Sequence, residues 1–264
     1  MSRMLAIVAR RPLSAAETIG TGALSEFAGL ARLHADGWGT AWCDETGTAH
    51  ASTSIEPLSG LAELDLATRQ PSRARLVYLR FASRGAPAVP GNSQPFLRDG
   101  MAFQHNGALT PREPALSLLD PATTRGLVGT TDSEVYFALV RRRLENAPPG
   151  TGALEATIET ARILREHYPS ACLNALVLVD DAVIVVQSSG GSGAPLSAFA
   201  DRGQRLDDLP PGHGAEYNRL RLVTPTSGVL VVSTTGTAAL GGAGLPEDTV
   251  SRIAPDGITT FALN

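Results

Sequence analysis

Residues 34–54 read HADGWGTAWCDETGTAHASTS, and this stretch anchors the prediction of the fold. Trp38–Cys43 and Ala49–Ser54 have the composition of β-strands, and the intervening Asp44–Gly47 is typical of a turn. The glycines on either side of Trp38 indicate close backbone packing where the first strand begins. The stretch therefore predicts two strands joined by a tight turn.

Further strands are expected on both sides of this segment. They are predicted for Leu5–Ala9, Leu76–Phe81, Met101–His105, Leu173–Val179, Ala182–Gln187, Leu220–Val223 and Gly228–Ser233. Residues 85–95 contain two glycines and three prolines, so this segment is expected to be a loop.

Helical patterns interrupt this series of strands. Apolar residues recur at helical spacing over Ser25–Ala35, which predicts an amphipathic helix. Thr131 and Glu134 form a capping-box pair in front of a second helix, Val135–Leu144, and Ala153–His167 is a third. Because strands and helices do not alternate as βαβ units, an antiparallel α+β fold is favoured over a doubly wound parallel sheet.

The composition is that of an ordinary globular protein. Of 264 residues, 43% are hydrophobic and 18% are charged, and the formal net charge of -4 gives no reason to expect nucleic acid or membrane as a partner. No repeat or linker divides the sequence, so residues 1–264 are predicted to form a single domain. All 22 basic residues are arginine, which excludes Schiff-base chemistry and a Walker-type phosphate loop, since both need lysine.

The two cysteines, Cys43 and Cys172, cannot form a disulfide framework and are predicted to be small buried hydrophobes. The apolar stretch Met4–Ala9 is too short for the core of a signal peptide. No segment has the length that spanning a bilayer requires. The sequence thus predicts a cytoplasmic protein.

Five short motifs follow one another in the first half of the chain. They are His34-Ala35-Asp36-Gly37-Trp38-Gly39, Leu79-Arg80-Phe81-Ala82-Ser83, Asn92-Ser93-Gln94-Pro95-Phe96, Phe103-Gln104-His105-Asn106-Gly107 and Gly129-Thr130-Thr131-Asp132-Ser133-Glu134. In this order they resemble the glutaminase domain of class II glutamine amidotransferases, which are N-terminal-nucleophile hydrolases. The resemblance extends over most of the chain, to about Ser233. It implies a four-layer αββα sandwich with the nucleophile at the tip of the first strand.

Ser2 stands where the resembling family has its nucleophilic cysteine. Removal of Met1 would leave Ser2 with a free α-amino group beside its own hydroxyl. Such an amine has a pKa of about 7.7–8.0, so part of it is neutral at physiological pH and can accept the hydroxyl proton. Considered alone, a serine after Met1 is one of the commonest chain starts and carries no functional signal.

Asn106 and Gly107 follow an apolar strand, where a backbone N–H and a side-chain amide can converge on one oxyanion. The resemblance implies that this pair is the oxyanion hole. The alternative is a plain Asn-Gly turn, which is frequent in hairpins.

Four further residues are implied to bind substrate. Arg80, assisted by Ser83, would hold the α-carboxylate of a glutamine or γ-glutamyl substrate, because a strand-end arginine offers a bidentate fork. Asp132 would receive the α-ammonium group, and His105 would orient the loop of the oxyanion pair. The alternatives are a solvated arginine, a helix-capping aspartate and a buried histidine.

The chain departs from the family pattern at two positions. Ser2 replaces the nucleophilic cysteine, and Gln94 stands where the family commonly has histidine in an Asn-x-His-Pro-Phe string. Glutamine can hydrogen-bond but cannot carry a proton charge. The five histidines have no ligand spacing with one another or with cysteine, so no metal is predicted. No cofactor is predicted either.

These patterns favour an amidohydrolase that cleaves glutamine or a γ-glutamyl amide through Ser2, without an ammonia-accepting domain in the same chain. A separate ammonia-accepting synthase is an alternative partner. A second hypothesis is a pseudoenzyme that binds a glutamine-like ligand or a partner protein without cleaving it. A third is that Ser2 is an engineered replacement of cysteine. The leaving amine and the oligomeric state do not follow from the sequence.

Overall fold

The computed structural model describes residues 2–83 and 85–263, and these form two antiparallel sheets. The first sheet has the spatial order β11-β9-β10-β1-β4-β2-β3. Its strands are Ala243–Gly244 (β11), Arg221–Val223 (β9), Val229–Ser233 (β10), Arg3–Leu13 (β1), Ser72–Leu79 (β4), Trp38–Cys43 (β2) and Ala49–Ser54 (β3). The second sheet has the order β13-β12-β8-β7-β6-β5. Its strands are Gly257–Ala262 (β13), Thr249–Ala254 (β12), Ala182–Gln187 (β8), Asn174–Val179 (β7), Met101–Asn106 (β6) and Phe96–Arg98 (β5).

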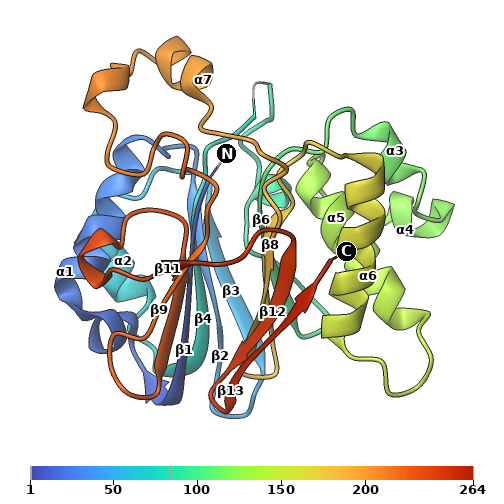
Figure 1. The fold of residues 1–264 in the computed structure, drawn as a ribbon, viewed down its shortest axis with the longest axis horizontal. Coiled ribbons are helices and arrows are strands. Elements are labelled where there is room, and N and C mark those ends of the chain that lie inside the picture. The colour runs from blue at the N-terminus through green and yellow to red at the C-terminus, as the bar shows by residue number, and fades with distance from the viewer. Residues whose placement is uncertain (1, 84, 264) are drawn as a thin grey trace.

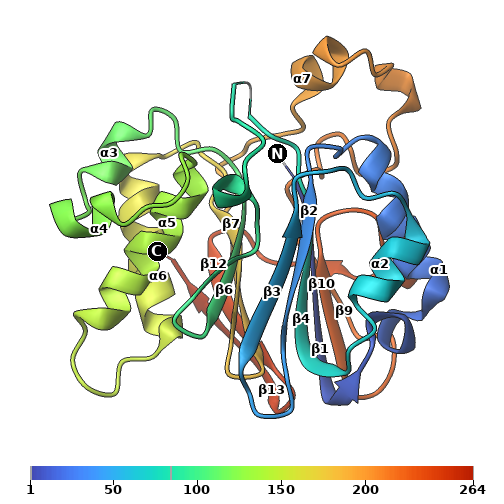
Figure 2. The same cartoon turned by 180° about the vertical axis from the view of Figure 1, so that it is seen from behind.

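Helices cover the outer faces of both sheets (Figure 1). The α-helices are Ala15–Gly29 (α1), Leu61–Ala67 (α2), Glu113–Leu116 (α3), Pro121–Arg125 (α4), Asp132–Glu145 (α5), Ala153–His167 (α6) and Leu196–Asp201 (α7). Short 3-10 turns occur at Leu30–Arg32 (η1), Pro90–Asn92 (η2), Leu206–Asp208 (η3) and Ala238–Leu240 (η4). Seen from behind, α1 and α2 flank the first sheet, while α5 and α6 flank the second (Figure 2). None of these helices combines the length and apolarity that crossing a lipid bilayer requires.

The layers are therefore helix, sheet, sheet and helix, as the four-layer prediction required. Strand β1 shows how the sequence produces them. Met4, Ala6 and Val8 pack between the sheets, whereas Leu5 and Ile7 pack against the helices of the first sheet. Because both faces of β1 are covered, its apolar run is continuous rather than alternating.

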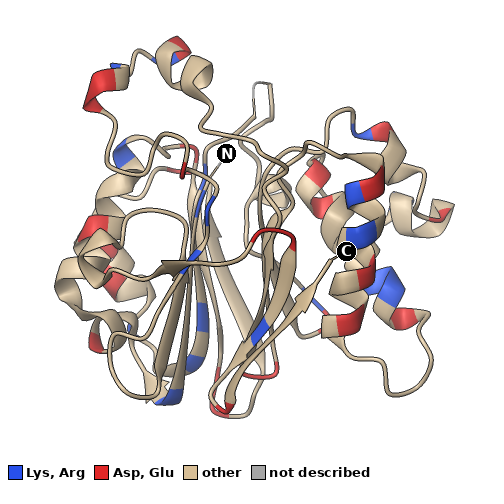
Figure 3. Cartoon of the chain, in the orientation of Figure 1, with Lys and Arg blue, Asp and Glu red and all other residues tan. Residues whose placement is uncertain are grey.

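Charged residues are concentrated on the helices and connecting segments, with few on the strands (Figure 3). On α5 and α6 acidic and basic side chains are mixed, as in the pair Arg143–Glu159 at 3.5 Å. Cys43 and Cys172 are buried free thiols, as predicted, and burial raises the pKa of Cys172 to about 11.

The first helix was placed wrongly. It begins at Ala15, not Ser25, because Ser14 caps it: the Ser14 hydroxyl accepts from Glu17 N, and the Glu17 carboxylate accepts from Ser14 N at 2.8 Å. Gly20 has a φ of 80° inside this helix, which interrupts the helical pattern in the sequence. The regular helix ends at Gly29 and continues only as the 3-10 turn η1.

Other predicted boundaries shift less. The hairpin β2–β3 and helix α6 have the predicted bounds, and β4 runs from Ser72 to Leu79, so Arg80 follows the strand. The capping box of α5 is only half formed. Thr131 accepts from Glu134 N at 3.2 Å, but the Glu134 carboxylate binds the backbone of residues 128 and 129 instead of Thr131.

Candidate active site

Three strand ends meet where the two sheets open toward α7, close to the N-terminus in Figure 1. Strands β1 and β4 are antiparallel neighbours, with Arg3 opposite Leu79, so the start of β1 lies beside the end of β4. Strand β6 of the facing sheet ends at Asn106. The topology therefore brings Ser2, Arg80 and Asn106 together.

Ser2 is 3% exposed, and its Oγ and its backbone nitrogen are held by three hydrogen bonds. Its Oγ accepts from the Tyr78 hydroxyl at 2.7 Å and from Phe81 N at 3.0 Å. Its backbone nitrogen donates to Asn106 Oδ1 at 2.7 Å. Two donors directed at one hydroxyl oxygen stabilise negative charge on that oxygen, so this arrangement suits a nucleophile.

Tyr78 was not singled out from the sequence. It is fully buried in β4, and burial raises its pKa above the ordinary value, so the phenol remains a neutral donor. The available signal was its position two residues before Arg80, which in an extended strand places both side chains on one face.

Asn106 is oriented by a second asparagine. Its Nδ2 donates to Asn218 Oδ1 at 3.1 Å, while its Oδ1 accepts from Ser2 N. Asn218 is held in turn, because its Nδ2 donates to Ser192 O at 2.8 Å. A carboxamide has two N–H donors, and the second N–H of Asn106 has no hydrogen-bond acceptor among the described residues. Asn218 lies outside the five motifs, and no sequence signal marked it.

Gly107 has a steric reason to be glycine. A Cβ at this position would collide with the carbonyl oxygen of Cys172 and crowd the His105 ring. The close approach of the two backbones lets Gly107 line the same cavity as Ser2.

Arg80 is a cation that lacks an acidic partner among the described residues. It is 5% exposed, and its guanidinium donates to the carbonyl oxygens of Asp36 at 3.2 Å and Pro87 at 3.3 Å. A buried charge held only by carbonyls gains most from a carboxylate ligand. The binding role implied for Arg80 remains a prediction.

Asp132 is the first residue of α5, as its capping position predicted. Its Oδ2 accepts from Leu109 N at 2.6 Å, which ties the helix start to the segment after Gly107. Asp132 and the exposed Ser83 both line the cavity that contains Ser2.

His105 also lines the cavity, with both ring nitrogens engaged. Nε2 lies 3.0 Å from the Cys172 carbonyl oxygen, and Nδ1 lies 2.9 Å from Ser133 Oγ. A carbonyl only accepts, so Nε2 carries the proton and Nδ1 accepts from Ser133. Burial lowers the pKa of His105, which keeps the ring neutral. Gln94 Oε1 accepts from His105 N at 2.6 Å and thus serves as a hydrogen-bonding support.

The Asp36-Gly37-Trp38-Gly39 segment contacts the residues that border the cavity. Asp36 Oδ2 accepts from Ala82 N at 2.7 Å and pairs with Arg202 at 2.6 Å, so it fixes the segment that follows Arg80. A side chain at Gly39 would collide with the Gln94 carbonyl. Trp38 is buried in the core against the helices, as its structural interpretation predicted.

The cavity has a volume of about 460 Å³, within the range of small-molecule sites. It brings together six of the seven predicted site residues as lining: Ser2, Arg80, Ser83, His105, Gly107 and Asp132. Asn106, the seventh, is fully buried directly behind Ser2.

Residues 1–192 match the family model described as "Glutamine amidotransferases class-II". The chain belongs to the class II glutamine amidotransferases. Two solved structures share the fold of this chain. The glutamine phosphoribosylpyrophosphate amidotransferase of B. subtilis has a TM-score of 0.63 and 13% identity, covering 99% of this chain and 49% of the other. A class II glutamine aminotransferase domain protein from Silicibacter pomeroyi has a TM-score of 0.60 and 17% identity, covering 99% of both chains.

Among curated proteins, this chain is similar to a gamma-glutamyl-hercynylcysteine sulfoxide hydrolase of Mycolicibacterium smegmatis. The two are 34% identical over 145 residues, which cover 54% of this chain and 57% of the relative. The match thus spans little more than half of the relative's length.

Proposed function

We propose that this amidotransferase hydrolyses the γ-amide of glutamine or of a γ-glutamyl amine, with Ser2 as an N-terminal nucleophile after removal of Met1. The observation that carries the proposal is the convergence of Ser2, Arg80, Gly107 and Asp132 on one cavity. The relative from Mycolicibacterium smegmatis, whose name describes a hydrolase of a γ-glutamyl compound, supports this class of substrate.

The amino-acid head group would be recognised by charge. Among residues 2–83 and 85–263, the partners of Arg80 are backbone carbonyls, so a substrate α-carboxylate can take a bidentate position on it. Asp132 offers its remaining carboxylate oxygen to the α-ammonium group, with Ser83 beside Arg80. Reading both charges selects a γ-glutamyl unit over a simple amide.

The chemical step transfers an acyl group in two stages. The Ser2 hydroxyl proton passes to the neutral α-amine of Ser2 as Oγ attacks the γ-carbon. The oxyanion that forms is held by the free N–H of Asn106 Nδ2 and by Gly107 N. The C–N bond then breaks, the amine leaves with the proton, and water hydrolyses the γ-glutamyl ester to release glutamate.

Serine is a weaker nucleophile than cysteine, and the contacts of Ser2 Oγ compensate for part of this. Tyr78 and Phe81 N both donate to the oxygen, which favours its partly ionised form in the transition state. The second candidate is a protein that binds a glutamine-like ligand without turnover. The hydrogen bonds from Tyr78 and Phe81 N also support it, because each of them makes the Ser2 hydroxyl less reactive as long as that hydroxyl keeps its proton.

We further propose that residues 1–264 act as one domain in the cytoplasm, without a bound cofactor. Alternatively, the ammonia released by the same cleavage of glutamine passes to a separate synthase. The two uses differ in whether a second protein raises the rate of glutamine cleavage.

Intact mass spectrometry, before and after incubation with a diazoketone analogue of glutamine, tests the proposal. We expect loss of Met1 and one covalent adduct on Ser2, and no adduct on the Ser2→Ala variant. Turnover of γ-glutamyl amides by Ser2→Ala at the parent rate would refute the mechanism. If Met1 is retained or no adduct forms, and the protein nevertheless binds glutamate, the protein that binds without turnover is favoured. The Ser2→Cys variant then shows whether a thiol restores turnover.

A further inference from the structure

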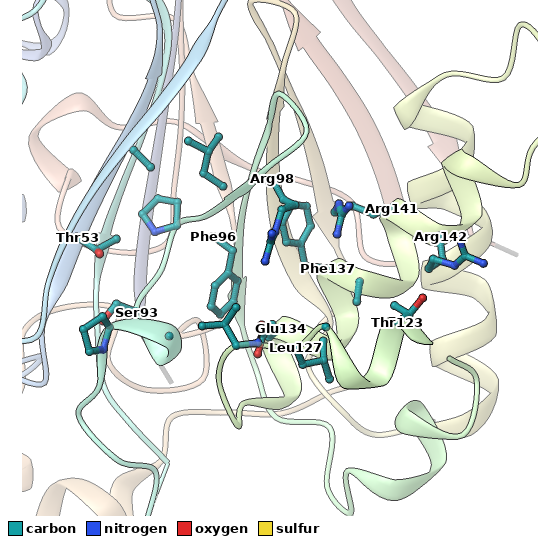
Figure 4. Close-up of a pocket in the computed structure, with 18 of the residues that line it drawn as sticks. Thr53, Ser93, Phe96, Arg98, Thr123, Leu127, Glu134, Phe137, Arg141 and Arg142 are labelled. Carbon is teal, nitrogen blue, oxygen red and sulfur yellow. Dashed lines mark hydrogen bonds between the residues drawn. The ribbon is translucent and has the colours of Figure 1, made fainter. Parts of the chain in front are cut away.

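A second cavity, of about 610 Å³, lies between β3, β5 and helices α4 and α5 (Figure 4). It shares no lining residue with the Ser2 cavity. Residues 90–95 form the wall between the two. Along this segment Gly91 and Ser93 line the second cavity, whereas Asn92 and Gln94 line the Ser2 cavity.

The wall is closely packed. A Cβ at Gly129 would collide with the Gly91 carbonyl and with Asn92 Oδ1, so the two segments are in close contact. The same alternation occurs on α5, where Glu134 lines the second cavity and Asp132 lines the first. The two cavities therefore lie back to back rather than forming one channel.

One side of the second cavity is aromatic and apolar. The rings of Phe96 and Phe137 stack with centroids 6.4 Å apart and planes 13° from parallel. Leu127 completes this side, and Val128 and Leu97 are 69% and 40% exposed at the cavity. Such a surface gains free energy by covering its apolar area with a flat ring.

The other side carries one uncommitted positive charge. The Arg98 side chain forms no hydrogen bond or ion pair within residues 2–83 and 85–263, whereas its backbone pairs with Met101 in the ladder of β5 and β6. Arg141 pairs with Asp99 and Glu145, and Arg142 pairs with Glu145 at 2.7 Å. Arg98 and Arg141 both line this cavity, and both are labelled in Figure 4. The Arg141 guanidinium carbon is 5.9 Å from the centroid of the Phe137 ring.

The acidic groups of the cavity limit the charge of a ligand. Glu134 is fully engaged, because its two oxygens accept from Val128 N at 2.6 Å and Gly129 N at 2.8 Å. A dianion would be repelled by Glu134 and Glu145, whereas a monoanion matches the single free guanidinium of Arg98.

We propose that this cavity is a binding site for an aromatic monocarboxylate, with the ring against Phe96 and Phe137 and the carboxylate on Arg98. The site is connected to the substrate clamp by hydrogen bonds. Asn92 Oδ1 accepts from Thr130 N at 2.7 Å, and Asn92 Nδ2 donates to Pro87 O at 3.1 Å, the oxygen that also accepts from Arg80. A ligand that fixes Gly91 and Val128 therefore restricts the segment that positions Arg80.

Calorimetric titration of the full chain with indole-3-acetate tests the site, with neutral indole-3-acetamide as the matched probe. We expect saturable binding with a Kd near or below about 1 mM, as for a small fragment in a preformed pocket. Binding should weaken at least about tenfold for the acetamide and for Arg98→Gln, since each removes one charge-assisted interaction. Arg73→Gln, which removes a half-exposed arginine on β4, is the control and should leave the Kd unchanged.

Amide hydrogen exchange tests the connection without any need for turnover. Indole-3-acetate should slow exchange in residues 85–95 and 128–134, and Asn92→Ala should abolish the effect on 85–95 alone. No saturable heat up to about 10 mM, or equal affinity for acid and amide, would overturn the site. Unchanged exchange in the presence of bound probe would overturn the connection. None of these outcomes depends on whether Ser2 is a nucleophile.

Discussion

Arg3 donates from Nε to the carbonyl oxygen of Ser2 at 2.6 Å, and its guanidinium carbon lies 3.5 Å from the centre of the Tyr217 ring. Arg3 is fully buried, and its other bonds go to Tyr217 O at 2.9 Å and Thr235 Oγ1 at 3.0 Å. Burial lowers the pKa of Arg3, and no carboxylate within residues 2–83 and 85–263 forms an ion pair with it. A positive charge thus lies one residue from the proposed nucleophile.

This charge should keep the α-amine of a processed Ser2 neutral. A nearby cation disfavours the ammonium form, so the pKa of that amine should lie below its ordinary value of about 7.7–8.0. Arg3→Met should raise that pKa by about one unit and move the acidic limb of the kcat/KM profile to higher pH, whereas Arg3→Lys should keep it. A limb that stays in place in Arg3→Met, with the variant folded by circular dichroism, would contradict this role.

Removing the Tyr78 hydroxyl should slow catalysis without weakening substrate binding. Tyr78→Phe deletes the 2.7 Å bond to Ser2 Oγ, and hydrogen bonds to a developing charge contribute about 1.5–3 kcal/mol. We expect kcat to fall about 10- to 100-fold with KM nearly unchanged. Tyr136→Phe, which alters another fully buried tyrosine, is the matched control and should retain the parent kcat. Equal losses in both variants would point to general destabilisation.

Arg80 should determine recognition of the substrate α-carboxylate. Arg80→Gln removes the charge but keeps hydrogen-bonding capacity, and we expect kcat/KM for glutamine to fall at least about 100-fold, mainly through KM. The measurement should be repeated with 4-aminobutyramide, which lacks the carboxylate. The parent should prefer glutamine strongly, and the variant should lose that preference. A preserved preference would assign the carboxylate to another residue.

The stability of the fold should decrease in mild acid because of a buried histidine pair. His34 Nε2 and His213 Nε2 lie 3.4 Å apart near Arg3. Burial lowers the pKa of His34 well below its ordinary range, and burial followed by the charge of Arg3 lowers that of His213 to about 4. Both histidines are therefore neutral in the folded protein at pH values where the unfolded chain begins to bind protons.

Since the folded pKa is the lower one, this stabilisation is present above pH 6.5 and is lost as the pH falls toward about 4. For His213 the change in the free energy of unfolding is at most about 3 kcal/mol, at 1.36 kcal/mol for each unit of pKa difference, and screening by nearby solvent reduces it. Urea unfolding between pH 7 and 4 measures it, and His213→Phe should flatten the pH dependence. An unchanged slope in that variant would contradict the assignment.

Local signals in the sequence were sufficient for part of the fold. The hairpins β2–β3 and β7–β8 and helix α6 were predicted within a residue or so, because turn residues and apolar periodicity act over short distances. Helix α1 was misplaced because Gly20 interrupts its pattern. Strands β12 and β13, near the C-terminus, were not predicted. The β12 strand pairs with β8, which lies more than sixty residues earlier in the chain, so local sequence does not indicate it.

The order of the motifs predicted seven site residues, and the structure places six of them around one cavity, while their roles remain predictions. It did not reveal Tyr78, Asn218 or the contact between Arg3 and Tyr217, because each depends on which strand ends meet in space. The capping box of α5 is only half formed because of a contact that also depends on how distant segments pack. Glu134 binds the preceding loop, whose position is fixed by the segment around Asn92.

The sequence by itself determined the antiparallel α+β class, the identity of the motif residues and the serine at position 2, since these are carried by residue type and short-range spacing. Only the tertiary structure decided which groups contact Ser2 Oγ, that Arg80 lacks an acidic partner among the described residues, and that a second cavity lies behind the first. Hydrogen bonds between residues 76 to 214 positions apart depend on how whole sheets pack. No local pattern in the chain specifies that packing.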